Sequence, residues 1–146
     1  MFKKILLATD GSVSSETAMK LAFELGSTHG ATVVGLYVID PYPFIGIGSI
    51  NPMGYVTYMD SAKIHAAEVH QHFLELAQQI APSVEIECLL LEGASASDGI
   101  LQSSKEQHCD LIVLGSHGRG GLGRLMLGSV ATKVVNESLI PVLIAR

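Results

Sequence analysis

The first forty residues alternate between apolar runs and polar turns in the order expected for a strand, a helix and a second strand. Residues 2–9 (FKKILLAT) form an apolar run that stops at an Asp-Gly-Ser turn cluster, which predicts a buried strand leading into a loop. Apolar positions then recur at i, i+3, i+4 and i+7 over 18–25, with Ser14 and Ser15 available as caps, so a helix is expected. Residues 31–38 (ATVVGLYV) are apolar on both parities, which is typical of a strand covered on both faces of a parallel sheet.

A long loop and a long helix are predicted next. Residues 39–56 hold three of the five prolines and three glycines, with aromatic residues and little charge. Such a loop is often functional, and its apolar content favours a lid or an interface, with a flap over part of the core as the alternative. From residue 57 to 81 an apolar residue recurs every three or four positions, so one amphipathic helix is expected, ended by Pro82. Its stripe consists of Ala62, Ala66, Val69, Phe73, Leu76 and Ile80.

The second half of the chain continues the alternation. Apolar runs, turn residues and helical spacing predict a strand near a sheet edge at 84–91, a short helix between 95 and 107, a strand at 111–114, a helix after Gly128 and a last strand at 142–145. This order predicts one α/β domain, residues 1–146, with an open, mostly parallel sheet and helices on both faces.

Composition narrows the class of protein. The chain has 146 residues, of which 48% are hydrophobic and 16% charged, so it can enclose a core as one domain. Its net charge of −5 speaks against general binding to nucleic acid or anionic membranes. No apolar run approaches the roughly 18 residues of a membrane span, and the start reaches Asp10 too soon for a signal peptide. A cytoplasmic protein without membrane insertion is expected, and Cys88 and Cys109, which lack metal-ligand spacing, are predicted to be buried or half-buried.

Glycines concentrate directly after the predicted strand at 111–114. Six of the 15 glycines fall within residues 115–128, where missing side chains let backbone N–H groups approach a ligand closely. The helix that opens at Gly128 and Ser129 offers free N–H groups, a positive dipole end and a hydroxyl. The pattern predicts a phosphate site, and the alternative is a solvated loop that ends in a helix cap.

The charge around this segment is inverted relative to the whole chain. No acidic residue lies between Asp110 and Glu137, whereas Arg119, Arg124 and Lys133 are positive. A local anion site within an acidic protein is therefore favoured.

Other phosphate-related patterns do not fit. The P-loop pattern is absent because no second glycine precedes Lys133. Residues 118–123 match G-x-G-x-x-G, but the predicted sheet is nearly complete there, so we attribute this match to chance. A receiver domain would need an aspartate after the third strand, where the chain has Leu90-Leu91-Glu92.

The glycine spacing resembles that of a known family. Together with Asp10-Gly11-Ser12 after the first strand and the C-terminal Pro141-Val142-Leu143-Ile144, the pattern Gly115-x2-Gly118-x9-Gly128-Ser129 resembles the universal stress protein family, and specifically its ATP-binding subclass. The resemblance covers essentially the whole chain. It implies a Rossmann-like fold of the adenine nucleotide alpha hydrolase type, with five parallel strands in the order 3-2-1-4-5. It also implies a homodimer, for which we expect the last strand (Val142 to Ala145) to form the contact, and bound ATP or another adenine nucleotide, with Mg²⁺ as a possible companion.

The resemblance also assigns residues to the nucleotide. Asp10 would face the ribose, Val38 would offer main-chain groups to adenine, and the remaining nucleoside contacts would come from Ala8, Thr9, Leu114 and Gly115. The phosphates would meet backbone N–H groups of Gly118, Gly128, Ser129 and Val130, with the Ser129 hydroxyl and Arg119 adding contacts and Ala131 in the same turn. Two positions depart from the family pattern: Ala8 stands where many members have proline, and Ala131 where a polar residue is common.

No catalytic or metal-binding residue is predicted. His70 and His72 lie about 200° apart on a helix and His65 is not four residues before either, so we expect solvated side chains. His117 lies inside the glycine pattern, but the sequence identifies no nucleophile or orienting carboxylate beside it. Asp10 has an alternative role as a turn residue that bonds its own backbone.

Together with this resemblance, the patterns lead us to expect a nucleotide-dependent regulatory or sensor module, acting in stress adaptation or on a partner protein. The alternative is a slow Mg²⁺-dependent ATP hydrolase, or a nucleotidyl or phosphoryl transferase. A third reading is a dimerisation scaffold with an empty site, against which the intact glycine spacing argues.

Overall fold

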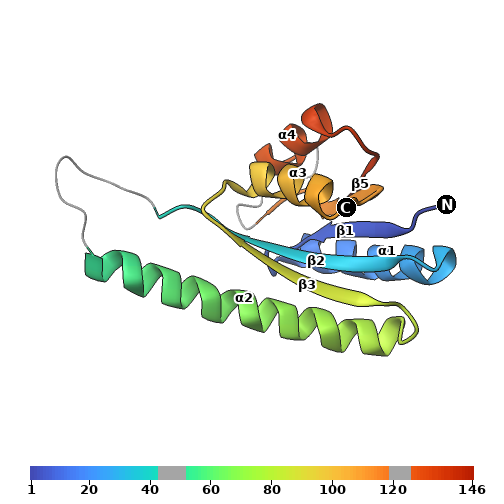
Figure 1. Ribbon diagram of the computed structural model, residues 1–146, viewed down its shortest axis with the longest axis horizontal. Coiled ribbons are helices and arrows are strands. Elements are labelled where there is room, and N and C mark those ends of the chain that lie inside the picture. The colour runs from blue at the N-terminus through green and yellow to red at the C-terminus, as the bar shows by residue number, and fades with distance from the viewer. Residues whose placement is uncertain (43–51, 119–125) are drawn as a thin grey trace.

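The computed structural model describes residues 1–42, 52–118 and 126–146, which form one open sheet between two pairs of helices (Figure 1). Strands and helices alternate along the chain, so the predicted α/β class is confirmed. The elements are β1 (Lys4–Ala8), α1 (Val13–His29), β2 (Thr32–Ile39), α2 (Pro52–Ile80), β3 (Ile86–Glu92), α3 (Ala96–Glu106), β4 (Leu111–Gly115), α4 (Ser129–Glu137) and β5 (Val142–Ala145).

Strand β1 lies at the centre of the sheet. The order is β3-β2-β1-β4-β5 and the neighbouring strands pair in parallel, as expected. Leu6 of β1 pairs with Val34 of β2 on one side and with Ile112 of β4 on the other. The chain therefore winds outward from β1 to β3 and then returns to build β4 and β5. The strand order reverses between β1 and β4, and the loops that leave these two strands diverge there.

Alternate side chains of the central strands enter two separate cores. Ile5 and Leu7 are fully buried in the core under α1 and α2, while Leu6 and Ile112 are fully buried in the core under α3 and α4. Figure 1 shows these helix pairs on opposite faces of the sheet. Because both faces are covered, the central strands need apolar side chains on both parities, which explains their unbroken apolar runs.

Helix α2 packs closely on the sheet at Gly35 of β2. The rings of Phe23 on α1 and Phe73 on α2 lie 5.1 Å apart between centroids. A Cβ atom added to Gly35 would lie only 2.5 Å from the ring of Phe73, so the glycine makes room for that ring. Overpacking at such a contact costs about 1–3 kcal/mol.

Helix ends differ in how they are capped. The cap of α1 is Ser12, whose side chain accepts from the Ser15 N–H, and not Ser14 or Ser15 as predicted, because the helix begins already at Val13. Helix α3 has an equivalent cap at Ser95. Helix α4 begins at Ser129, and its cap residue is Gly128, which has no side chain to cap the helix.

The long helix begins earlier than the sequence pattern predicts. It begins at Pro52, so residues 52–56 are helical and do not belong to a loop, and residues 43–51 lie outside the described residues. Proline suits the first turn of a helix, where its missing N–H costs nothing. The apolar spacing does not reveal these first turns, because Met53 and Val56 are exposed and do not belong to the buried stripe of the helix. Nothing in the described chain is long and apolar enough to be a membrane-spanning helix.

The histidines of α2 make more contacts than predicted. The ring of His70 is half-buried and its Nε2 lies 3.1 Å from the carbonyl oxygen of Gly35, so the expectation of a solvated side chain is wrong here. The Nε2 of His72 lies 3.6 Å from a carboxylate oxygen of Glu16, across the contact between α2 and α1. In the part of the chain that the structure describes, no three His, Cys, Asp or Glu side chains are arranged to hold a metal.

The two cysteines differ in exposure. Cys109 is buried, and burial raises the pKa of its thiol to about 11. Cys88 is exposed, contrary to the prediction, because it lies on the edge strand β3, which is covered less completely than the central strands.

We predict that His70 makes the stability of the fold sensitive to acid. Burial lowers the pKa of His70 from its usual value of 6.5, so below that pH the unfolded chain binds a proton that the native chain resists. The free energy of unfolding of the wild type should therefore fall as the pH drops through 6.5 toward 5. In His70→Gln this part of the decline should disappear, as measured by urea denaturation followed by circular dichroism. His108→Gln, at an exposed ring, is the control and should keep the wild-type slope. Parallel slopes for wild type and His70→Gln would contradict the prediction.

Candidate functional site

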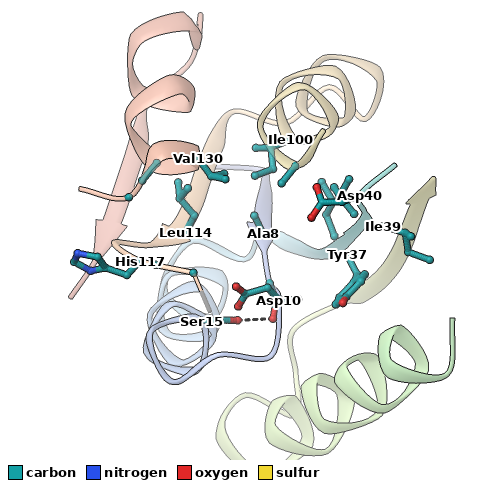
Figure 2. Close-up of a pocket in the computed structure, with 18 of the residues that line it drawn as sticks. Ala8, Asp10, Ser15, Tyr37, Ile39, Asp40, Ile100, Leu114, His117 and Val130 are labelled. Atoms are coloured by element: carbon teal, nitrogen blue, oxygen red, sulfur yellow. Dashed lines mark hydrogen bonds between the residues drawn. The ribbon is translucent and has the colours of Figure 1, made fainter. Parts of the chain in front are cut away.

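A cavity of about 560 Å³ opens at the carboxyl edge of the sheet, where β1 and β4 diverge (Figure 2). This is the edge at which open parallel sheets bind ligands, and the volume is within the range of small-molecule sites. Ala8 stands near the middle of the view in Figure 2, with Val130 and Ile100 above it and Asp10 below. The cavity therefore reaches both faces of the sheet.

The two sides of the cavity differ in polarity. The side toward α3 and α4 is mainly apolar and includes Ala8, Val38, Ile100, Leu114 and Val130, with the Asp40 carboxylate beside Ile100 (Figure 2). The side toward α1 and α2 carries carboxylate, hydroxyl and imidazole groups from Asp10, Tyr58, Ser61 and His65. Such a site suits a ligand with one flat apolar part and one hydrogen-bonding part.

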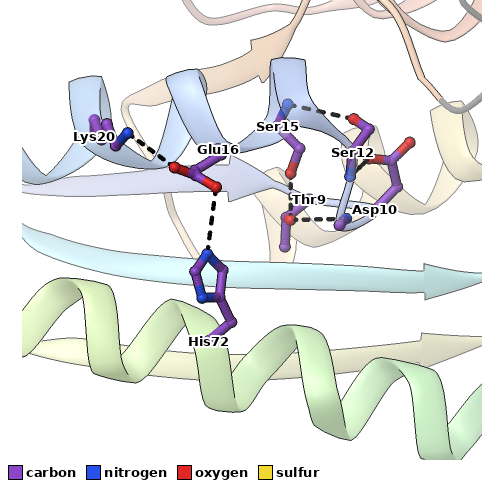
Figure 3. A network of polar contacts seen from close by, with 8 residues as sticks. Thr9, Asp10, Ser12, Ser15, Glu16, Lys20 and His72 are labelled. Atoms are coloured by element: carbon purple, nitrogen blue, oxygen red, sulfur yellow. Dashed lines mark hydrogen bonds and ion pairs between the residues drawn. The ribbon is translucent and has the colours of Figure 1, made fainter.

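The loop after β1 is held by its own polar contacts (Figure 3). The buried hydroxyls of Thr9 and Ser15 bond each other. The Asp10 Oδ1 accepts the Ser12 N–H at 2.9 Å, so the turn role considered for Asp10 is present. Its other oxygen, Oδ2, lies 3.0 Å from the position that a Cβ on Gly118 would take. The Asp10 carboxylate thus shapes the turn and also faces the glycine segment.

The glycine segment, residues 115–128, is described at its two ends, and these ends approach each other closely. The Gly128 N–H donates to the Ser116 carbonyl at 2.8 Å, and a Cβ on Gly128 would lie 3.2 Å from that same oxygen. The Gly128 N–H is therefore already used, and the expectation that it faces a phosphate does not hold in this structure. The next three N–H groups, of Ser129, Val130 and Ala131, have no acceptor within their own helix, because they belong to its first turn.

Eleven of the twelve residues predicted for the nucleotide line this one cavity. They are Ala8, Thr9, Asp10, Val38, Leu114, Gly115, Gly118, Gly128, Ser129, Val130 and Ala131. The twelfth, Arg119, lies outside the described residues, as does Arg124.

Positive charge at the cavity is smaller than the sequence count suggests. The Lys133 ammonium lies 2.7 Å from a carboxylate oxygen of Asp98 on α3, which lowers the pKa of Asp98 and raises that of Lys133. Its charge is thereby balanced by a residue far away in the sequence. In the described part of the site, attraction for an anion comes from backbone N–H groups and the dipole of α4.

Several residues of the cavity were not predicted. The inward stripe of α2 is apolar at Val69 and Phe73, but it continues as His65, Ser61 and Tyr58 where it lines the cavity. The ring of His65 packs edge-on against Tyr37, with centroids 5.8 Å apart. The same helical spacing of three and four would have found these residues if the stripe had been followed toward Pro52.

His117 contributes backbone to the wall while its ring is held elsewhere. Its Nδ1 bonds the Ser116 hydroxyl at 2.9 Å. Figure 2 shows the ring turned away from Ala8.

Fold and cavity together define a class: a single-sheet α/β protein with a glycine-lined cavity at the point where the strand order reverses. Within this class, the chain belongs to the universal stress protein family, whose sequence profile matches residues 1–146.

Individual relatives match over the full length of the chain. Universal stress protein MJ0531 of Methanocaldococcus jannaschii is 32% identical over 146 residues, which are 100% of this chain and 83% of the relative. Universal stress protein YxiE of Bacillus subtilis is 35% identical over 150 residues, covering 100% of both chains. The structure of universal stress protein UspA from Lactobacillus plantarum has a TM-score of 0.82 at 22% identity, covering 99% of this chain and 97% of its own.

Several structural neighbours were solved with nucleotides, among them one universal stress protein in complex with cAMP. The universal stress protein from Archaeoglobus fulgidus, in complex with dAMP, has a TM-score of 0.72 at 20% identity and covers 100% of this chain and 98% of its own. A family protein from Arabidopsis thaliana, with AMP bound, has a TM-score of 0.68 at 20% identity and covers 98% and 90%. At these identities the likeness shows the fold.

We predict that a side chain at Gly115 destabilises the protein. A Cβ there would lie 2.5 Å from the Ser14 Oγ and 2.9 Å from the backbone carbonyl atoms of the same residue, so the first turn of α1 would have to move. Gly115→Ala should lower the free energy of unfolding by about 1–3 kcal/mol in chemical denaturation. Gly118→Ala, whose Cβ would meet the Asp10 carboxylate and no other side chain among the described residues, is the matched control and should lose less. Equal losses in the two variants would contradict this view of the contact.

Proposed function

We propose that the chain binds an adenine nucleotide, with ATP as the physiological ligand, in the cavity between β1 and β4. The observation that carries this proposal is that one cavity joins an apolar side, the Asp10 carboxylate and the start of α4, which has no side-chain cap. The AMP and dAMP bound by the structural neighbours support adenine as the base.

The base and the sugar fit the two sides of the cavity. Adenine is flat and apolar on its faces, so Ala8, Val38 and Leu114 offer it contact area, and the main chain of Val38 can pair with its edge. Asp10, held by the Ser12 N–H, can accept hydrogen bonds from ribose hydroxyls.

The phosphates fit the start of α4. The N–H groups of Ser129 and Val130, the Ser129 hydroxyl and the helix dipole all favour negative charge. Gly118 lines the same end of the cavity. Mg²⁺ would arrive with the triphosphate, since it prefers phosphate oxygens and water, and the Ser129 hydroxyl is the protein oxygen available at that end.

We further propose a regulatory role for the bound nucleotide, in a cytoplasmic homodimer that forms through the exposed edge of β5 and acts on a partner protein in stress adaptation. Among the described strands, β5 ends the sheet and pairs with β4 alone, so its outer edge offers backbone groups to a second copy of the chain. We favour a binder over a hydrolase because the sequence identifies no nucleophile or orienting carboxylate beside His117, and in the structure its Nδ1 bonds the Ser116 hydroxyl while its ring is turned away from Ala8 (Figure 2).

We predict that freshly purified protein carries an adenine nucleotide. Native mass spectrometry should show a particle of twice the 15.5-kDa chain mass with about one nucleotide per chain, and titration of the emptied protein should give saturable binding of ATP. Gly118→Val should weaken ATP binding about 10- to 100-fold, because its side chain collides with Asp10 and fills the phosphate end. Ala67→Val, on an exposed face of α2, is the control and should bind as the wild type. Failure of the wild type to bind ATP, ADP or AMP would overturn the proposed function.

We predict little or no multiple turnover of ATP. With excess ATP, phosphate or ADP release measured with and without Mg²⁺ should stay at or below about one equivalent per chain, because we assign no described lining residue as a base that activates a water. Repeated turnover that depends on Mg²⁺ and is lost in Gly118→Val would instead establish the hydrolase or transferase alternative.

A further inference from the structure

A side chain of helix α1 contacts the described start of the glycine segment, residues 115–118. The hydroxyl of Ser14 donates a hydrogen bond to the carbonyl oxygen of His117, a residue 103 positions away in the sequence. Ser14 lies in the first turn of α1 and does not line the cavity. This contact therefore acts on the backbone of the segment and cannot act directly on a ligand.

A second contact joins the same two parts of the chain. Gly115 lies so close to Ser14 that a Cβ on the glycine would stand 2.5 Å from the Ser14 Oγ. The start of α1 thus touches the segment at Gly115 and again at His117. The position of this turn is fixed relative to α1.

The hydrogen bond sets the direction of the next N–H group. In a planar trans peptide the C=O of His117 and the N–H of Gly118 point in opposite directions. Because Ser14 holds the carbonyl toward α1, the Gly118 N–H points away from α1. The Gly118 nitrogen lies 3.9 Å from the position that a Cβ on Gly128 would take, which places it beside the start of α4. This is the end of the cavity with the N–H groups of Ser129 and Val130.

We propose that Ser14 is a positioning residue for phosphate binding. It locks the peptide between His117 and Gly118 so that the Gly118 N–H, and not the His117 carbonyl, faces the phosphate end. Without the hydroxyl the peptide can rotate and present a carbonyl oxygen, which repels a phosphate. This inference rests on the proposed binding of a nucleotide in the cavity.

The hydroxyl of Ser14 is not needed to start helix α1. Ser12 supplies the cap of that helix, and Ser15 bonds Thr9. Ser12→Ala is therefore a matched control: it removes a serine hydroxyl from the same turn and lowers stability, but it leaves the bond to His117 intact.

The test compares ligands that differ only in phosphates. ATP, AMP and adenosine are titrated by calorimetry into wild type, Ser14→Ala and Ser12→Ala. In Ser14→Ala the affinity for ATP and AMP should fall about 10-fold, while that for adenosine should change by less than about 2-fold. In Ser12→Ala the ratio of ATP to adenosine affinity should stay at the wild-type value.

A measurement on the wild type alone tests the same point if Ser14→Ala does not fold. In ¹H–¹⁵N spectra, AMP should move the Gly118 amide resonance at least as far as that of Ser129, whereas adenosine should not. An unmoved Gly118 amide, an equal loss for adenosine and ATP in Ser14→Ala, or no loss at all would each overturn the role of Ser14 while nucleotide binding stands. Absence of binding in the wild type would remove both proposals.

Discussion

The site of this protein depends on one topological constraint, the central position of β1 in a parallel sheet that the chain winds in two directions. Parallel strands require crossover helices, and these cover both faces of the sheet (Figure 1). Because the winding reverses after β3, the loops that follow β1 and β4 leave in different directions. The cavity forms where these neighbouring loops separate, so it lies outside the two packed cores.

Close backbone approach shapes the cavity more than side-chain charge does. Gly115 lets the first turn of α1 touch β4, and Gly128 lets the start of α4 lie against Ser116. The uncapped first turn of α4 then provides N–H donors in a chain with a net charge of −5. An anion site made from the backbone is compatible with an acidic surface, because the attraction acts over one helical turn. The positive charge of Lys133 adds little to this attraction, because it is paired with the Asp98 carboxylate.

The long helix α2 serves both the core and the site. Over the sheet its inward side chains are buried and apolar, as at Phe73 and Ala77. Its first turns extend past the carboxyl ends of the strands (Figure 1), and there Tyr58, Ser61 and His65 give the cavity a polar wall. The inward face of α2 is therefore apolar over the sheet and polar at the cavity. Because this polar wall lies on one side of the cavity, it favours one orientation of a ligand that has an apolar part and a polar part.

The sequence by itself determined the alternation of strands and helices, the buried strands and the glycine pattern, because burial on two faces and helical spacing leave periodic marks in a single chain. Eleven residues of the cavity could be predicted for a different reason, because the fixed glycine spacing of the sequence resembles the motif of the universal stress protein family. Only the tertiary structure decided that Pro52 begins α2, since its first turns are exposed. It alone also decided that the Gly128 N–H is used by Ser116, that Lys133 is paired and that Ser14 holds His117. These are contacts between residues distant in sequence or between backbone groups, and neither kind leaves a periodic signal.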